Sequence, residues 1–168
     1  MSDDQLFGPE PLGPYHDVSR FDCGIDSLNE FLIKRALSDQ QADKSRTYVV
    51  ARQNRVVGYF SVAAASIEPQ GASARAAKGQ GAQAIPGILI GRLSVDRGEQ
   101  GRGIGEALLI EALRKAAAAA ETIGARVVLV NAIHETVTAF YLRYGFEASP
   151  TDPLHLMVLM KDVRKTLG

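Results

Sequence analysis

The sequence predicts an α/β or α+β domain in which helices flank one mixed central sheet. Two observations lead to this prediction. Runs rich in β-branched and aromatic residues alternate with runs of helical period along the chain. In addition, a strand-like run at 87–95, GILIGRLSV, is joined to a long helical run by a turn that contains four glycines. An initial hairpin followed by alternating strands and helices gives a sheet of mixed strand direction.

The N-terminal segment predicts an extended lead-in and one helix. Residues 1–19 contain proline and glycine and are typical of an extended lead-in that ends in a short strand. Ser27 and Glu30 have the S-x-x-E spacing of a capping box, and apolar residues recur on one helical face from Leu28 onward. We therefore expect a helix over residues 26–41.

The middle of the chain predicts a hairpin and then a long loop. RTYVVAR at 46–52 and RVVGYFSVAAASI at 55–67 are rich in β-forming residues and flank a short polar turn. The stretch at 68–87 holds glycine, alanine and small polar residues and has no clear period. A structureless stretch of this length inside a compact domain is usually functional or mobile.

The C-terminal half alternates helices and strands. Its expected elements, in order, are a helix at 104–123 ended by Gly124, a strand at 125–133, a helix within 134–146 ended by Gly145, and a strand at 155–161. The near-continuous apolar character of the strand at 87–95 indicates burial on both faces. No internal repeat or second domain is visible, so we expect one domain over residues 1–168.

Composition narrows the classes of function. Hydrophobic residues make up 46% and charged residues 23% of the 168 residues, the mix of a globular domain. The 19 basic and 19 acidic side chains cancel, so any basic surface must come from local clustering. Cys23 is the only cysteine, which excludes an intrachain disulfide. The N-terminus lacks the basic and apolar regions of a signal peptide, and no apolar run reaches about 20 residues, so we expect a cytoplasmic protein without membrane contact.

The glycine-rich turn after the strand at 87–95 is the strongest local signal. It lacks the Lys-Ser/Thr pair of a P-loop, because Gly105 is followed by Glu106. It also fails the G-x-G-x-x-G dinucleotide pattern, whose last glycine would fall on Glu106 or Leu108. The letters QGRGIG, which begin at Gln100, match Q-x-x-G-x-G, the pyrophosphate loop of acyl-CoA-dependent N-acetyltransferases.

Elementary electrostatics favours a phosphate ligand at this turn. Backbone N–H groups at a helix start point outward and carry the positive end of the helix dipole. Glycine lets the backbone approach phosphates without a Cβ clash, and Arg102 adds positive charge nearby. The alternative is a tight turn that simply requires glycine.

Beyond this motif, the sequence resembles the GNAT N-acetyltransferases and, more narrowly, the GNAT toxins of type II toxin–antitoxin modules. The resemblance spans residues 21–160 and rests on the stretches FDCG…LNEFLIKRA, SRTYVVA, VVGYFSVAA, IGRLSVDRGEQGRGIGEALL and AFYLRYGFEASPTDPLHLMV. Ordinary members of the superfamily lack, as a set, the segments FDCG, GRLSVD and FYLRYGF followed by SPTDPLHLM.

This resemblance implies a fold, an activity and partners. The fold is the GNAT fold, in which the middle strands of the sheet splay apart. The activity is transfer of acetyl from acetyl-CoA to the α-amine of the amino acid on a charged tRNA, which stops translation. A ribbon-helix-helix antitoxin neutralises such toxins, and the toxins commonly form homodimers.

Catalytic roles follow from the resemblance and from chemistry. Tyr141 matches the family's catalytic tyrosine, and a phenol can protonate the CoA thiolate that leaves when an amine attacks the thioester. Position alone separates it only weakly from Tyr144, and a core aromatic is the alternative role for Tyr141. We expect the Val95 N–H to polarise the thioester carbonyl, as in an oxyanion hole.

Acetyl-CoA is expected to contact the strand end, the glycine turn and the catalytic tyrosine. The pantetheine arm would pair with the free backbone of the splayed strand like an added strand. Asn131 would bond a pantetheine amide, and a merely polar strand end is the alternative. The expected contacts are Leu93, Ser94, Val95, Gln100, Gly101, Arg102, Gly103, Ile104, Gly105, Asn131, Phe140 and Tyr141. No metal is expected.

RNA binding would need a positive groove, and no general base stands out. The candidate RNA contacts are Lys34, Arg35, Lys44, Arg46, Arg75, Lys78 and Arg92. Each alone is more often a solvated charge, except Arg92, which enters a buried strand next to the glycine turn. Glu68 and His134 are candidates for a water-linked base, and each is more typical of a solvated surface residue. A free α-amine titrates close to neutral pH and an ester neighbour lowers its pKa, so a base is not required.

Two other functions stay open at this point. An acetyltransferase of the same fold can act on a small amine or a protein N-terminus, with no tRNA requirement and salt-insensitive catalysis. A non-catalytic acyl-CoA-binding protein would bind acetyl-CoA tightly without transfer to any amine.

Overall fold

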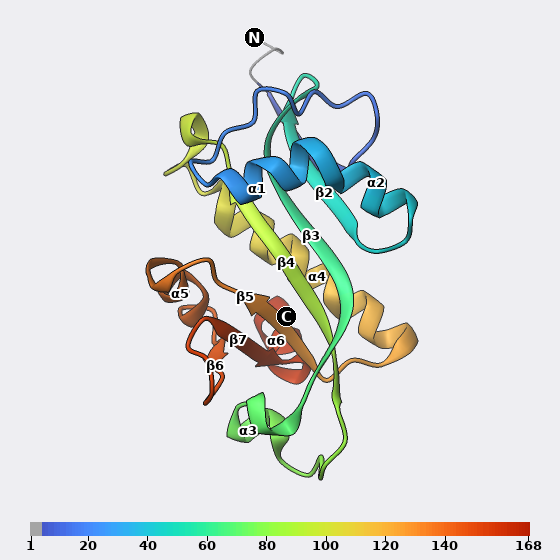
Figure 1. Cartoon of the computed structure of the whole chain (residues 1–168), viewed down its shortest axis with the longest axis vertical. Coiled ribbons are helices and arrows are strands. Elements are labelled where there is room, and N and C mark those ends of the chain that lie inside the picture. Colours follow the sequence, from blue (N-terminus) through green and yellow to red (C-terminus); the bar gives the residue numbers. More distant parts are fainter. Residues whose placement is uncertain (1–4) are drawn as a thin grey trace. The chain divides into compact units, whose positions relative to one another are not determined.

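A computed structural model describes residues 5–168, over which seven strands form one mixed sheet in the order β1-β2-β3-β4-β5-β7-β6 (Figure 1). The strands are β1 Leu6–Pro11, β2 Arg46–Arg52, β3 Arg55–Ile67, β4 Ile85–Val95, β5 Val127–Asn131, β6 Glu147–Ala148 and β7 His155–Leu159. The helical elements are α1 Asp26–Glu30, η2 Phe31–Arg35, α2 Ala36–Gln41, η3 Pro69–Gly71, α3 Ala74–Ala77, η4 Arg97–Glu99, α4 Ile104–Ile123, α5 Glu135–Leu142 and α6 Met160–Leu167. The fold class expected from the sequence is confirmed.

The chain divides into two compact units. Unit 1 takes the chain up to Ala63 together with Arg92–Ala112, and unit 2 takes Ala64–Gly91 together with Leu113–Gly168. The long elements β3, β4 and α4 each contribute residues to both units. Each unit is described by itself below.

Unit 1 is built on the predicted hairpin. Strands β2 and β3 pair antiparallel from Arg46 opposite Val62 to Arg52 opposite Arg55, and β1 pairs antiparallel with β2. An aromatic core lies against this sheet, in which the Tyr59 ring meets the Phe21 ring at 5.5 Å and the Phe31 ring at 6.2 Å. The hairpin prediction is confirmed, whereas the strand expected at the end of residues 1–19 lies earlier, at Leu6–Pro11. The part of the lead-in at residues 1–4 lies outside the described residues.

The first helix covers the predicted range but differs from the prediction in its capping and its winding. It runs without a break over Asp26–Gln41, with a π-helical turn at η2. The predicted capping box is wrong, because the N-cap position belongs to Ile25 and no side chain caps the helix. Ser27 already lies inside the first turn. The segment that leads into the helix is held instead by Asn29, whose side-chain oxygen accepts a hydrogen bond from the Cys23 N–H at 2.9 Å.

Unit 2 has a mixed sheet with β5 at its centre. Strands β4 and β5 pair parallel from Gly87 opposite Val127 to Ile90 opposite Val130, and β5 pairs antiparallel with β7. These strands confirm the predictions at 87–95, 125–133 and 155–161. The helix α6 was not predicted, because the apolar run HLMVLM carries no stop signal where β7 ends at Leu159.

The segment 68–87 is more ordered than expected. It holds η3 and α3, and Ala72 and Ala76 are buried in the core of unit 2. The Arg126 guanidinium donates to the carbonyl oxygens of Ala76 at 2.8 Å and of Arg75 and Lys78 at 3.2 Å, and so satisfies the end of α3. The expectation of a structureless loop is wrong here, because contacts this distant in sequence leave no local pattern.

The helix α4 begins and ends where the sequence predicts, at Ile104 and Ile123. Its buried positions recur at helical spacing, as expected for an amphipathic helix. Gly124 follows with a φ of +73°, the left-handed conformation that commonly ends helices. Among the described residues, no helix is both long enough and apolar enough to span a membrane.

Candidate functional site

The glycine turn adopts a backbone that only glycine takes easily. Gly101 and Gly103 have φ values of +81° and +82°, in the left-handed region. A Cβ added at either position would meet no heavy atom within 4 Å, so the requirement for glycine lies in the backbone and not in the space around it. Alternation of right- and left-handed residues turns successive N–H groups toward one side, an arrangement typical of anion-binding sites at helix starts.

The other motif residues have different roles. Gly105 has no left-handed φ, and a Cβ there would make an ordinary contact of 3.7 Å with the Val95 side chain. The Gln100 side-chain amide donates to the Val95 carbonyl at 2.9 Å and to the Cys23 carbonyl at 3.3 Å. Gln100 therefore ties the turn to the end of β4 and to the FDCG segment.

The FDCG segment braces the same turn. The Asp22 N–H donates to the Asp96 carboxylate at 3.0 Å, and the Arg97 N–H donates to the Asp22 carbonyl at 2.9 Å. Hydrogen bonds from the Gly24 N–H and then from the Asn29 amide lower the pKa of the Asp22 carboxyl. Sequence reasoning did not assign Asp22, Asn29 or Asp96 a role in the site. The only available signal was the presence of FDCG and GRLSVD in the family resemblance.

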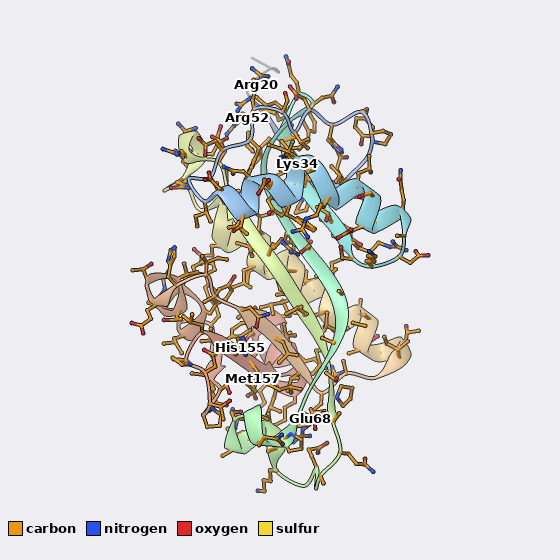
Figure 2. All side chains as sticks on the ribbon, viewed as in Figure 1. Arg20, Lys34, Arg52, Glu68, His155 and Met157 are labelled. Carbon is orange, nitrogen blue, oxygen red and sulfur yellow. The ribbon has the colours of Figure 1, made fainter. Side chains whose placement is uncertain are left out.

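A cluster of arginines surrounds one buried carboxylate beside the turn. Glu99 accepts two hydrogen bonds from Arg52, labelled in Figure 2, at 2.9 and 3.0 Å. The Arg102 guanidinium lies 3.3 Å from Glu99 and the Arg55 guanidinium 4.0 Å. These contacts, the hydrogen bonds of Arg52 above all, lower the pKa of the Glu99 carboxyl. Glu99 thus holds three arginines beside the turn, and Arg102 is the most exposed of them.

The end of β4 carries the other expected contacts of unit 1. Ser94 is buried, and Leu93 and Val95 are half-buried. Arg92 lies on the Phe31 ring, with its guanidinium carbon 3.7 Å from the ring centroid, and Arg35 lies over the same ring at 5.3 Å. Burial lowers the pKa of the Arg92 guanidinium. The structure thus brings Arg35 and Arg92 together on one aromatic side chain.

The remaining candidate RNA contacts differ in how their charges are paired. Three of them form ion pairs: Lys34 with Glu30 at 3.1 Å, Arg46 with Asp43 at 2.8 Å, and Arg75 with Asp162 at 2.8 Å. Lys44 and Lys78 are exposed. Arg75 and Lys78 lie in unit 2, and the other five candidates lie in unit 1.

Unit 2 contains the candidate acid. Tyr141 is buried on α5, where its ring meets the Phe140 ring at 5.2 Å and the Phe146 ring at 5.5 Å. Burial raises the pKa of the Tyr141 phenol to about 12. The phenol therefore keeps its proton at neutral pH, as a general acid must. Tyr144 follows the end of the helix and is only half-buried.

The polar candidates of unit 2 lie at the ends of its strands. Asn131 is the last residue of β5 and pairs with His155 on β7, and both are exposed. Glu68 is exposed just after β3. His134 is the N-cap residue of α5, and its ring lies 3.0 Å from the Thr136 hydroxyl. Within residues 5–168, no group of His, Cys, Asp and Glu side chains is placed to hold a metal ion.

Comparison with known proteins identifies the family that the sequence matches and relatives whose activity is named. The acetyltransferase (GNAT) domain family matches residues 43–148. A tRNA-acetylating toxin of Mycobacterium tuberculosis is 44% identical over 160 residues, which cover 95% of this chain and 96% of that protein. The solved structure of AtaT complexed with acetyl-methionyl-tRNAfMet aligns with a TM-score of 0.86 and 26% identity, over 98% of this chain and 99% of that one. A tyrosine-to-phenylalanine mutant of AtaT, bound to the C-terminus of the antitoxin AtaR and to acetyl-CoA, aligns with a TM-score of 0.82 and 27% identity, over 97% and 98% of the two chains.

Proposed function

The chain belongs to the GNAT acetyltransferases, and on that premise we propose that it acetylates the α-amine of the amino acid on a charged tRNA and so blocks translation. The observation that carries this proposal is the likeness to a tRNA-acetylating toxin, which extends over nearly the whole of both chains. The matched family range runs through both compact units, which supports a single acetyltransferase domain over the chain.

The residues of unit 1 fit the pyrophosphate of acetyl-CoA. Two left-handed glycines, the start of α4 and the exposed Arg102 guanidinium meet at one turn. We assign pyrophosphate binding to the backbone of residues 101–105 together with Arg102. The bonds of Gln100 and of the FDCG segment hold this backbone in its binding shape before the ligand arrives.

The chemical step needs an activated carbonyl and a proton for the leaving group. Acetyl-CoA supplies a thioester that the α-amine attacks, so that a C–N bond forms, the C–S bond breaks and a thiolate leaves. The Val95 N–H donates to the carbonyl oxygen as negative charge develops on it. The Tyr141 phenol donates its proton to the thiolate sulfur. The α-amine of an aminoacyl ester is largely neutral at cellular pH and so attacks without a base. Its nitrogen then loses one proton to solvent, and solvent returns one proton to the Tyr141 phenolate.

Partners follow from the same proposal. Charged tRNA is the acceptor, which makes the cytoplasm the site of action. A ribbon-helix-helix antitoxin binds and neutralises the protein, and the active form is a homodimer. An antitoxin complex of AtaT, a structural relative, supports the assignment of an antitoxin as a partner.

The test is an acetylation assay with purified protein, labelled acetyl-CoA and a pool of charged tRNAs. Uncharged tRNA, free amino acids and a peptide with a free N-terminus are matched acceptors in the same assay. Label on charged tRNA alone supports the proposal. Label on free amines or on the peptide alone would contradict it and favour the small-amine or protein N-terminus alternative. Tight acetyl-CoA binding with no label anywhere would favour a binding protein.

A further inference from the structure

One face of the sheet in unit 2 is covered over only half its length. Val127 and Leu129 of β5 pack with Met157 of β7 in a core that Ala72 and Ala76 of the α3 segment close. Side chains two residues apart on a strand share a face, so Asn131 lies on this same face beyond Leu129. The α3 segment therefore covers the start of β5, and the carboxyl end of β5 stays open.

A cavity of about 310 Å³ occupies this open end. Its apolar walls come from Ala65 and Ile67 of β3, Leu89 of β4 and Leu129 of β5. Its polar lining consists of Ser66, Glu68, Asn131 and His155. Figure 2 labels Glu68 after β3 and His155 at the start of β7.

The polar groups come from fixed positions. Asn131 and His155 are directly opposite each other in the antiparallel pair of β5 and β7, which brings their side chains to one face. Asp152 accepts a hydrogen bond from the Leu154 N–H at 2.9 Å, and its other oxygen lies 3.4 Å from the His155 ring. This turn therefore orients the imidazole at the rim of the cavity.

The chemistry of the cavity matches a small amine with an attached side chain. A carboxylate, an amide oxygen and an imidazole can accept hydrogen bonds from an amine. The aliphatic walls can pack against the side chain of the amino acid that carries this amine. The volume lies at the small end of ligand sites, which suits an amino acid. In open α/β sheets, ligands bind outside the carboxyl ends of strands, and β5 leads from this end into α5, which carries Tyr141.

We propose that this cavity receives the aminoacyl group of the charged tRNA, that Ala65 limits the size of the accepted side chain, and that Glu68 disfavours acidic side chains. This inference rests on the proposed function and adds the residues that choose among charged tRNAs. Ala65 acts through volume, because a larger side chain there would fill the cavity. Glu68 acts through charge, because a second carboxylate placed beside it is repelled.

The experiment measures kcat/KM for a panel of tRNAs charged with glycine, alanine, methionine, phenylalanine, aspartate and glutamate. Ala65→Leu should lower the values for methionyl- and phenylalanyl-tRNA at least 10-fold relative to glycyl-tRNA, since a few methylenes decide fits of this kind. The matched control is Ala64→Leu, which adds the same side chain at the exposed neighbouring position. Acetyl-CoA affinity and thermal unfolding, measured for both variants, report whether the fold and the donor site are intact.

A second arm tests the charge. Glu68→Gln should raise kcat/KM for aspartyl- and glutamyl-tRNA about 10-fold relative to alanyl-tRNA, with acetyl-CoA affinity unchanged. If the unaltered protein acetylates charged tRNAs but both variants keep its profile, the cavity is not the aminoacyl site and only this inference fails. If the unaltered protein labels no charged tRNA, the proposed function itself fails. A loss of activity by Ala65→Leu that is equal for every acceptor would also overturn the inference.

Discussion

At the residue scale, the proposed reaction depends on the protonated state of one phenol. Burial raises the pKa of Tyr141 to about 12, and the same burial packs its ring against Phe140 and Phe146. A tyrosine that served the core alone would leave turnover intact when its hydroxyl is removed. A tyrosine that protonates the leaving thiolate would not.

Tyr141→Phe should lower kcat with charged tRNA about 100-fold or more, because general acid catalysis contributes on this order. The ring packing stays, so acetyl-CoA affinity measured by calorimetry should change less than about twofold. Tyr144→Phe, which removes the same atom from a half-buried ring nearby in sequence, is the matched control and should keep most of the turnover. Near-normal turnover in Tyr141→Phe would refute the assignment.

Glu99 should make stability depend on acid pH. Its folded pKa lies below the reference value of 4.5, so the stabilisation from its arginine pairs is present above about pH 4.5 and is lost as pH falls through the lowered folded pKa. Glu99→Gln should cost about 1–3 kcal/mol at pH 7, because the half-buried Arg52 and Arg55 lose a charged partner. Urea unfolding of both proteins between pH 3 and pH 7 tests this, and the variant should lose part of the acid-dependent slope. Equal slopes in the two proteins would contradict the role of Glu99.

At the element scale, the turn into α4 needs glycine because two of its residues have a left-handed backbone. Strand β3 needs glycine at Gly58 because no room exists there for a side chain. Gly101 and Gly103 are left-handed with open surroundings, whereas Gly105 is not left-handed. Gly58 on β3 lies so close to its neighbours that an added Cβ would be 2.9 Å from the Val50 side chain and 3.1 Å from Leu108 of α4. Substitutions at these two kinds of glycine should therefore fail in different ways.

Gly103→Ala should strain the backbone by about 1–3 kcal/mol and weaken acetyl-CoA binding, because relief of the strain turns the N–H groups away from their common side. The backbone at Gly105 is not left-handed, so Gly105→Ala should change the free energy of unfolding by less than about 0.5 kcal/mol. Unfolding curves and calorimetric titration with acetyl-CoA measure both effects. Equal strain in the two variants would show that the φ of Gly103 is not the cause.

Gly58→Ala should destabilise the protein by about 1–3 kcal/mol through overpacking. The close contacts involve the Val50 and Leu108 side chains rather than the glycine turn itself. The acetyl-CoA affinity of the folded fraction should therefore stay within about twofold of the original. Thermal unfolding with and without acetyl-CoA measures both quantities, and a stable variant with weakened binding would contradict this interpretation.

At the scale of the whole molecule, the proposed function requires a protein of zero net charge to bind two anionic ligands, acetyl-CoA and charged tRNA. Several of the basic side chains form ion pairs with acidic neighbours, as Lys34 does with Glu30. Arg35 and Arg92 instead gather on the Phe31 ring. Charge of this kind is local, so the summed composition did not reveal it.

The rate of tRNA acetylation should therefore fall steeply with salt, because phosphate contacts release counterions. Arg35→Gln should reduce the slope of log(kcat/KM) against log[salt] by about 1. Lys34→Gln, at the neighbouring position but already paired, is the matched control and should reduce it less. Rates measured between 50 and 200 mM salt would decide this, and a flat salt profile would contradict tRNA as the acceptor.

Local patterns were sufficient for the elements with strong periods or sharp boundaries. The hairpin at β2 and β3, the helix α4 and the strands of unit 2 lie where the sequence predicts them, because side-chain alternation, helical spacing and glycine stops are local properties. The segment 68–87 was misjudged, because its short helix α3 depends on hydrogen bonds from Arg126, far along the chain. The capping of the first helix differs from the prediction, because the hydrogen bonds of Asn29 to the Cys23 N–H and to Asp22 hold its start in place of the serine that the spacing suggested.

The sequence by itself determined the α/β class and the glycine turn, since these depend on residue type and on spacing along the chain, while the GNAT fold and the choice of Tyr141 as the candidate acid came from the resemblance to a family. Tertiary structure alone decided which arginines surround Glu99, that Gln100 braces the turn, and that a cavity opens at the carboxyl end of β5. Burial, local charge and free volume depend on which residues lie close together in space. Many of those residues are far apart in the sequence, so no local sequence pattern reveals them.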